Sequence, residues 1–144
     1  IDSCDFYPTV LDLLDLESPP DQRFDGASFA PALRGQPFER HTIFSYFPHA
    51  LPVPDNLRPG ITVHEGDWKL YRVFHNGEAG AHQWKLYHLS EDPGERRDVA
   101  ADHPDRVQRM DALIESFLKD THAIVPQPNP DYLPPEQRRP SGKK

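Results

Sequence analysis

The stretch WKLYRVFHNGEAGAHQWKLYHLSEDPGE, residues 68–95, contains the sequence WKLY twice, at 68–71 and at 84–87. Both copies alternate apolar and polar residues, which is the pattern of a half-buried strand. Turn signals stand before the first copy (EGD, 65–67), between the copies (NG, 76–77) and after the second (DPG, 92–94). The stretch therefore predicts neighbouring antiparallel strands that end in a turn of defined chemistry.

On either side of this stretch the chain predicts more strands and one long helix. The expected strands are Thr42–Phe47, Ile61–His64, Trp68–Phe74 and Gln83–Leu89, which form a meander. A helix is expected over about 103–119, with Asp102 as its cap and Pro104 in its first turn. Its apolar stripe consists of Val107, Met110, Leu113, Ile114, Phe117 and Leu118. The predicted class is α+β, with a small antiparallel sheet of about four strands packed against this long C-terminal helix and preceded by short helices.

The first 40 residues predict the short helices and a linker. A helix is expected over Asp5–Leu14, capped by Asp5, and its apolar residues surround most of its circumference. A second short helix is expected over Phe29–Leu33, with Ser28 as its cap. The first helix therefore needs apolar cover on several sides.

Composition limits what the chain can be. Its 144 residues correspond to one domain or a part of one, predicted as residues 1–40, a subdomain at 41–120 and a proline-rich tail at 121–144 that is extended or disordered. The net charge of −7 argues against a nucleic-acid partner, and no apolar run approaches the roughly 18 residues that span a bilayer. The chain has no initiator Met and begins inside a helix signal, so we expect it to come from a longer protein.

Few residue patterns in the chain indicate catalysis. The eight histidines include no pair at the helical i, i+4 spacing of a metal site, although His64 and His88 lie on expected strands and could be cross-strand neighbours. No serine has the Gly-x-Ser-x-Gly setting, and a single cysteine, Cys4, forms no internal disulfide. The segment Ser45–His49 ends a strand and opens a proline-rich loop, where binding sites are often built.

Four phrases in a fixed order resemble the C-terminal region of type I sulfatases. They are Asp5-x-Tyr7-Pro8-Thr9, Asp25-Gly26-x-Ser28-Phe29, Gly66-Asp67-Trp68-Lys69-Leu70 and Leu86-Tyr87-x-Leu89-x-x-Asp92-Pro93-Gly94-Glu95. The resemblance extends over nearly the whole chain. It implies membership of the alkaline-phosphatase superfamily, in which a large N-terminal α/β domain precedes a small C-terminal sheet with one helix.

The resemblance also implies where the chemistry of the full enzyme is located. Members of this family use a formylglycine nucleophile, made from a Cys/Ser-x-Pro/Ala-x-Arg motif, together with calcium. This chain lacks that motif, because Cys4 is followed by Asp5 and Phe6. We therefore carry over no catalytic residue and no metal ligand, and we expect calcium and formylglycine in an upstream catalytic domain. That domain is the expected partner, and a sulfated small molecule or glycan is the expected substrate of the full enzyme.

Two residues are candidates for substrate contact. In related members the segment that matches Ser45–His49 lies at the mouth of the pocket, which makes His49 and the neighbouring Tyr46 the substrate-binding candidates. The sequence departs from the family pattern at Asp15, which stands where glycine is common. Aspartate tolerates the left-handed conformation of a helix end, so the turn can be kept.

Two alternatives remain open. The chain can instead be a non-catalytic interaction module with the same fold, or the equivalent part of a phosphodiesterase or phosphonate hydrolase of the same superfamily. As a sulfatase fragment it should be inactive alone, brace the catalytic domain and shape one wall of the substrate pocket. Apolar surface on the first helix and on one face of the sheet should then be exposed and promote self-association. The localisation is undetermined, and export to the periplasm is common among bacterial members.

Overall fold

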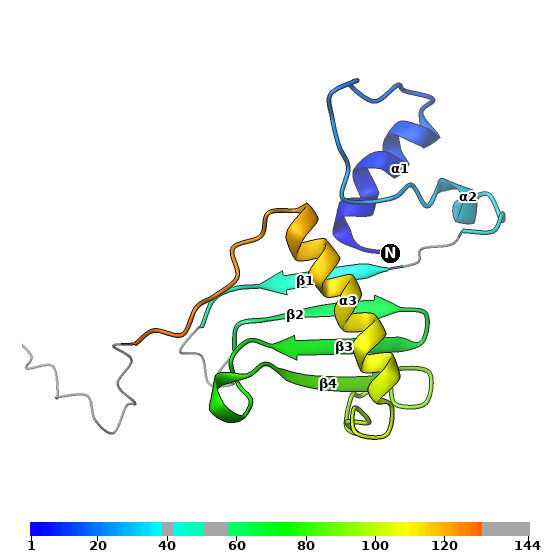
Figure 1. Cartoon of the computed structure of the whole chain (residues 1–144). Coiled ribbons are helices and arrows are strands. Elements are labelled where there is room, and N and C mark those ends of the chain that lie inside the picture. The colour runs from blue at the N-terminus through cyan, green and yellow to red at the C-terminus, as the bar shows by residue number, and fades with distance from the viewer. Residues whose placement is uncertain (39–41, 51–57, 131–144) are drawn as a thin grey trace, which may run out of the picture.

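A four-stranded antiparallel sheet with one long helix across it forms the main body of the chain (Figure 1). The computed structural model describes residues 1–38, 42–50 and 58–130. The strands are β1 (Ile43–Phe47), β2 (Gly60–Glu65), β3 (Trp68–Val73) and β4 (Gln83–His88), and they lie side by side in sequence order. The long helix is α3 (Pro104–Asp120). The predicted α+β class, the meander and the long helix are confirmed.

The repeated WKLY sequence pairs with itself across β3 and β4. Leu70 lies opposite Leu86, and each lysine of one copy lies opposite the tyrosine of the other. Because side chains alternate along a strand, both tryptophans and both leucines face α3, whereas the lysines and tyrosines face the opposite side. The turn at 66–67 connects β2 to β3, with Gly66 at φ 56°, a conformation that glycine adopts without strain.

The core lies between the sheet and α3. Leu70 and Leu86 have no exposed surface, and neither do Met110 and Ile114 of the helix. Phe44 of β1 stacks on Phe117 of α3, with ring centroids 4.4 Å apart. The predicted stripe of α3 is confirmed: Met110, Ile114 and Leu118 are buried, and Val107, Leu113 and Phe117 pack against them.

The predicted cap of α3 is wrong. His103, not Asp102, is the cap residue, and it forms no side-chain cap hydrogen bond. Pro104 occupies the first turn as expected, and its ring fixes the entry of the chain into the helix. The Asp102 carboxylate instead lies 3.8 Å from the Arg97 guanidinium.

The turn after β4 returns the chain along the edge of the sheet. One carboxylate oxygen of Asp92 accepts hydrogen bonds from the backbone N–H groups of Arg96 and Arg97, both at 2.8 Å. Further on, the N–H of Val99 donates to the carbonyl of Leu86 at 2.9 Å. The N–H of Leu86 in turn donates to the Asp98 carboxylate at 3.0 Å, so Asp98 and Val99 cover the outer edge of β4 at Leu86. The predicted turn at 92–94 is confirmed.

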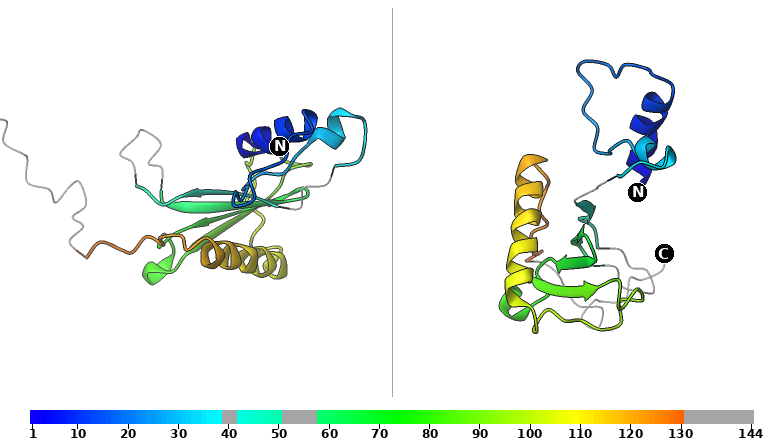
Figure 2. Two further views of the ribbon diagram at one scale, coloured as in Figure 1. Left: turned by 90° about the horizontal axis from the view of Figure 1, so that it is seen from above. Right: turned by 90° about the vertical axis from the view of Figure 1, so that its right-hand side faces the viewer.

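The N-terminal residues form a separate helical layer. It contains a short 3-10 turn η1 (Ser3–Asp5), α1 (Phe6–Leu13) and α2 (Ala30–Leu33). Helices α1 and α2 pack on each other, and the views agree that they lie beyond the β1 edge, on the side of the sheet away from α3 (Figure 2). Asp15 follows the C-cap residue Leu14 of α1 and has φ 51°, the left-handed conformation that aspartate was expected to tolerate here.

Candidate functional site

Tyr46, one of the two substrate-contact candidates, faces the helix side of the sheet. Its ring meets Phe74 edge-on, with centroids 6.2 Å apart, and its hydroxyl donates a hydrogen bond to the carbonyl of Ile124. Burial raises the pKa of this phenol above its ordinary value. Tyr46 therefore holds the chain that follows α3 against the sheet.

His49, the other candidate, is exposed beyond the end of β1. Its ring packs edge-on against Phe47, with centroids 5.6 Å apart. Phe47 and Tyr46 are consecutive in the strand, so their side chains lie on opposite faces of the sheet. The two candidates therefore point away from each other, and substrate contact by either one stays a prediction.

The histidine pair considered for a metal does not exist. His64 is opposite Lys69, whereas His88 is opposite Trp68 on the far side of β3. Burial, followed by the charge of Lys69, lowers the pKa of His64 and favours its neutral form. Within residues 1–38, 42–50 and 58–130, no group of three or more His, Cys, Asp or Glu side chains is placed to hold a metal ion.

Asp5 joins two segments that are distant in sequence, a role that the local pattern did not predict. It has no exposed surface, and its carboxylate accepts hydrogen bonds from the N–H of Asp2 at 2.6 Å and from the N–H of Ala27 at 2.9 Å. Asp5 is the N-cap residue of α1, as expected, but its side chain forms no cap hydrogen bond to this helix. Gly26 lies against the same turn: a Cβ at this position would be 2.1 Å from the carbonyl oxygen of Cys4.

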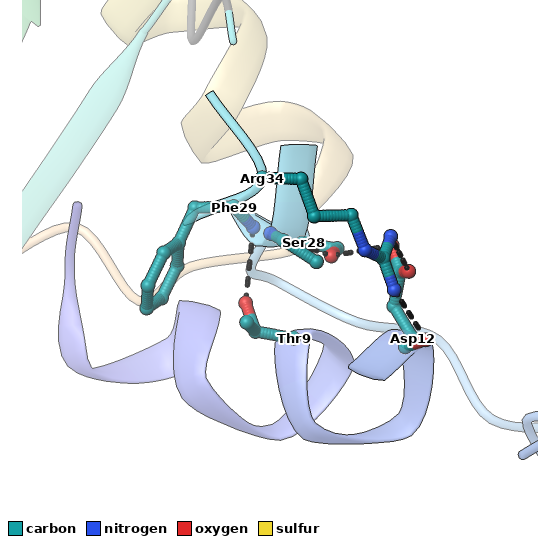
Figure 3. A network of polar contacts seen from close by, with 6 residues as sticks. Thr9, Asp12, Ser28, Phe29 and Arg34 are labelled. Atoms are coloured by element: carbon teal, nitrogen blue, oxygen red, sulfur yellow. Dashed lines mark hydrogen bonds and ion pairs between the residues drawn. The ribbon is translucent and has the colours of Figure 1, made fainter. Parts of the chain in front are cut away.

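Thr9 continues this connection one helical turn later. Its hydroxyl donates to the carbonyl of Asp5 at 2.6 Å and accepts from the N–H of Phe29 at 3.0 Å (Figure 3). Only 2 % of Thr9 is exposed, so water cannot replace either bond. We call the contacts of Asp5 and Thr9 with residues 27–29, together with the close approach of Gly26 to Cys4, the polar junction.

An ion pair extends the polar junction to the far end of α1. The Asp12 carboxylate accepts from the Ser28 hydroxyl at 2.7 Å and from the Arg34 guanidinium at 2.9 Å (Figure 3). These hydrogen bonds, with that of Ser28 the larger cause, lower the pKa of Asp12. The cap residue of α2 is Phe29, so the expected cap Ser28 is wrong by one position, although its hydroxyl accepts from the N–H of Ala30 at 3.2 Å.

The polar junction leaves the other side of α1 apolar and exposed. Its exposed apolar residues include Phe6 at 56 %, Val10 at 49 % and Leu14 at 62 %, with Leu33 of α2 at 60 %. We call the exposed residues Phe6, Tyr7, Val10, Leu13 and Leu14 the α1 apolar face. No large apolar side chain of the four strands is among the exposed ones in the described residues, so the expectation of an exposed apolar sheet face is wrong.

Sequence comparison gives the family. The model of the N-sulphoglucosamine sulphohydrolase C-terminal family matches residues 1–122, which include the polar junction, the sheet and α3. The chain belongs to this C-terminal sulfatase family. The resemblance to sulfatases expected from the four sequence phrases is therefore confirmed.

Individual proteins and solved structures match most of this chain. A sulfatase of Formosa agariphila is 29 % identical over 120 residues, which cover 80 % of this chain and 21 % of that protein. The structure of BT4656 in complex with its substrate D-glucosamine-2-N,6-O-disulfate matches with a TM-score of 0.63 and 23 % identity, over 82 % of this chain and 24 % of that one. The phosphonate monoester hydrolase of Agrobacterium radiobacter matches with a TM-score of 0.56 and 24 % identity, over 82 % of this chain and 24 % of that one. At these identities the structural matches establish the fold alone.

The chain thus spans about a quarter or less of the length of these relatives. The four sequence phrases now have a physical basis. Asp5, Thr9, Gly26 and Ser28 form or extend the polar junction, and the second pair of phrases forms β3, β4 and the turn at 92–94.

Proposed function

We propose that this chain is the C-terminal part of a longer sulfatase, in which it braces the catalytic domain and shapes one wall of the substrate pocket. The family match over residues 1–122 is the observation that carries this proposal. Because the chain corresponds to only 21 % of the Formosa agariphila sulfatase, most of such an enzyme lies outside it. On its own the chain is expected to hydrolyse no sulfate ester.

The α1 apolar face supports the bracing role. Val10 and Leu14 lie one helical turn apart and are both about half exposed or more, at 49 % and 62 %. Apolar side chains clustered in this way usually mark a surface that another protein surface covers. The polar junction fixes the opposite side of α1 to residues 27–29, so it orients this face rigidly. We infer that the catalytic domain covers the α1 apolar face.

The catalytic groups of the full enzyme are assigned to the remainder of the protein. In the described residues no set of side chains fits a metal ion, and Cys4 lacks the residues that formylglycine formation requires. We therefore propose that calcium and formylglycine belong to the catalytic domain, and no reaction step is placed on this chain. A sulfated small molecule or glycan is the proposed substrate class, in keeping with the disulfated glucosamine bound by BT4656.

A phosphonate or phosphodiester hydrolase is the second candidate, because the phosphonate monoester hydrolase has the same fold over 82 % of this chain. A non-catalytic interaction module is the third. The coding sequence upstream of Ile1 distinguishes the module from both enzymes, since a Cys/Ser-x-Pro/Ala-x-Arg motif there excludes it. Parallel assays of the parent protein with a chromogenic aryl sulfate and an aryl phosphonate separate the two enzymes.

The direct test compares the isolated chain with the parent protein in the aryl sulfate assay. The proposal expects turnover by the parent and none by the 144 residues. Turnover by the isolated chain would overturn it.

The wall of the pocket is tested separately at His49, whose exposed ring can be changed without disturbing the core. In the parent, His49→Gln should raise KM several-fold with unchanged thermal stability, whereas His122→Asn, at another exposed histidine, should leave KM unchanged. An unchanged KM for His49→Gln would remove this residue from the pocket.

A further inference from the structure

The face of the sheet that points away from α3 has a largely polar and partly basic surface. The side chains that alternate with the core residues project from it, and we call it the second sheet face. Its members are Ile43, Ser45 and Phe47 of β1, Gly60, Thr62 and His64 of β2, Lys69, Tyr71 and Val73 of β3, and Gln83, Lys85 and Tyr87 of β4. None of them is acidic, although the whole chain has a net charge of −7. The face thus carries positive charge in a chain that is acidic overall.

The WKLY repeat places two lysines on the second sheet face, and their surroundings differ. The Lys69 ammonium lies 2.6 and 2.7 Å from the two carboxylate oxygens of Glu95. Burial is the main cause that raises the pKa of Tyr87, opposite Lys69, and the negative charges of Asp98 and Glu95 add to it. Lys85, in contrast, forms no ion pair and no side-chain hydrogen bond with any residue that the structure describes. Lys85 is therefore the lysine whose charge can pair with an added anion.

Three hydroxyl groups continue from Lys85 in a row across the sheet. Lys85 lies opposite Tyr71 of β3. Thr62 of β2 lies opposite Tyr71 on its other side, and Ser45 of β1 lies opposite Thr62. Neighbouring strands are about 4.8 Å apart, so this row extends over about 14 Å. Within the described ranges the hydroxyls of Ser45 and Thr62 have no hydrogen-bond partner, so both can donate to and accept from a ligand.

Gly60 determines how Tyr71 lies in this row. A Cβ at Gly60 would be 2.4 Å from Cε2 of Tyr71, so the ring lies over the glycine backbone. The Tyr71 hydroxyl donates to the carbonyl of Arg58 at 3.4 Å, and its oxygen can still accept a hydrogen bond. Any side chain at position 60 would displace the ring. The ring is therefore held in one position between Thr62 and Lys85.

The second sheet face lies on the same side of the sheet as the N-terminal layer. Helices α1 and α2 are beyond the β1 edge, on the side away from α3 (Figure 2). A catalytic domain that covers the α1 apolar face would therefore stand beside this sheet face as well. His49 belongs to the same side, because its ring packs on Phe47, a member of the face, with centroids 5.6 Å apart. Of the two substrate-contact candidates, His49 thus accompanies the second sheet face, whereas Tyr46 faces α3.

We propose that the second sheet face is the wall of the substrate pocket, and that Lys85 binds an anionic substituent of the sugar, a sulfate or carboxylate, other than the ester that is cleaved. The inference rests on the proposed function, because it places the substrate between this chain and the catalytic domain. The Lys85 ammonium pairs with the anion, while Thr62 and Ser45 exchange hydrogen bonds with sugar hydroxyls. An apolar partner surface on this face would leave the Lys85 charge buried and unpaired, so it fits less well.

Binding to the 144-residue chain tests the proposal without any need for catalysis. The probe is D-glucosamine-2-N,6-O-disulfate, and binding is followed by two-dimensional NMR of the backbone amides. We expect the largest shifts at Thr62, Tyr71 and Lys85. Lys85→Gln should weaken the affinity about tenfold, because a charge-assisted contact is lost. N-acetylglucosamine, which has no charge, should produce no shift at Lys85.

Lys119→Gln is the matched control. It removes one exposed positive charge at the end of α3, on the other side of the sheet, and should leave the affinity unchanged. Equal affinity of Lys85→Gln and the unchanged chain for the disulfated sugar would overturn the proposal, as would shifts confined to other faces.

The parent enzyme provides the second readout. Lys85→Gln should raise KM several-fold for a substrate with a second anionic group and leave KM and kcat for a monosulfated aryl ester unchanged. A lower thermal stability of this variant with unchanged KM for both substrates would overturn the proposal, because the catalytic domain would then occupy the face. A parent that hydrolyses no sulfate ester, while the isolated chain binds the disulfated sugar through Lys85, would refute the proposed function and not the anion site.

Discussion

Thr9→Val tests the polar junction with a substitution that keeps the shape of the side chain. The change removes the donor to the Asp5 carbonyl and leaves the N–H of Phe29 without its acceptor. Since only 2 % of Thr9 is exposed, this N–H would stay away from water. A buried donor left without a partner costs about 1–3 kcal/mol, which corresponds to about 5- to 150-fold faster opening of the local structure.

Native-state hydrogen exchange is the appropriate assay, because it resolves α1 and α2 from the sheet. We expect the amides of residues 27–34 to lose protection in Thr9→Val while those of β3 keep it. Thr121→Val is the matched control, since its hydroxyl donates one hydrogen bond, to Phe117 at 2.7 Å, in an exposed position. Unchanged protection at Phe29, or an equal loss in β3, would refute the structural role assigned to Thr9.

Three further predictions concern single residues. Gly26→Ala should unfold the N-terminal layer, because its Cβ would be 2.1 Å from the carbonyl oxygen of Cys4. Gly35→Ala is the control: its Cβ would have no atom within 4 Å, so the substitution should cost only about 1 kcal/mol for the positive φ. Thermal melts followed by circular dichroism compare the stability of the two variants. Because the pKa of Asp12 is lower in the folded state than the unfolded-state pKa of 3.8, its ionised carboxylate stabilises the folded state above pH 3.8. This stabilisation is lost as the pH falls through the folded-state pKa. Asp12→Asn should therefore flatten the acid dependence of amide hydrogen exchange at residues 28–34. Arg72→Ala should cost about 3 kcal/mol in urea unfolding, because Arg72 is 3 % exposed and pairs with Asp111 at 2.9 Å; a loss below about 1 kcal/mol would contradict this.

The sheet and α3 could be predicted because their signals are local. Alternation in the two WKLY copies places Leu70 and Leu86 on one face, and the four-residue spacing of Met110, Ile114 and Leu118 forms the matching stripe. The two-residue turn between β2 and β3 left few other pairings for these two strands. Local periodicity was thus sufficient to predict which residues form the main core.

Long-range polar contacts could not be predicted in the same way. Asp5 has the sequence position of a helix cap, yet its carboxylate accepts from Ala27, 22 residues further along the chain. Nothing in the local pattern distinguishes these roles, because both satisfy backbone N–H groups near a helix start. Tyr46 is similar: its hydroxyl donates to Ile124, 78 residues away, which the sequence of β1 does not indicate. The order and spacing of the family phrases was the one signal that grouped Asp5, Thr9 and Gly26.

The measurement that tests the central claim most directly is the effect of Val10→Asp in two contexts. In the isolated chain Val10 is 49 % exposed, so the free energy of unfolding should change by no more than about 0.5 kcal/mol. In the parent sulfatase the catalytic domain is expected to cover this position, and an unpaired buried carboxylate should cost about 3 kcal/mol or more and lower the yield of active enzyme. Equal tolerance of the substitution in both proteins would contradict the claim that the α1 apolar face is the surface on which the catalytic domain rests.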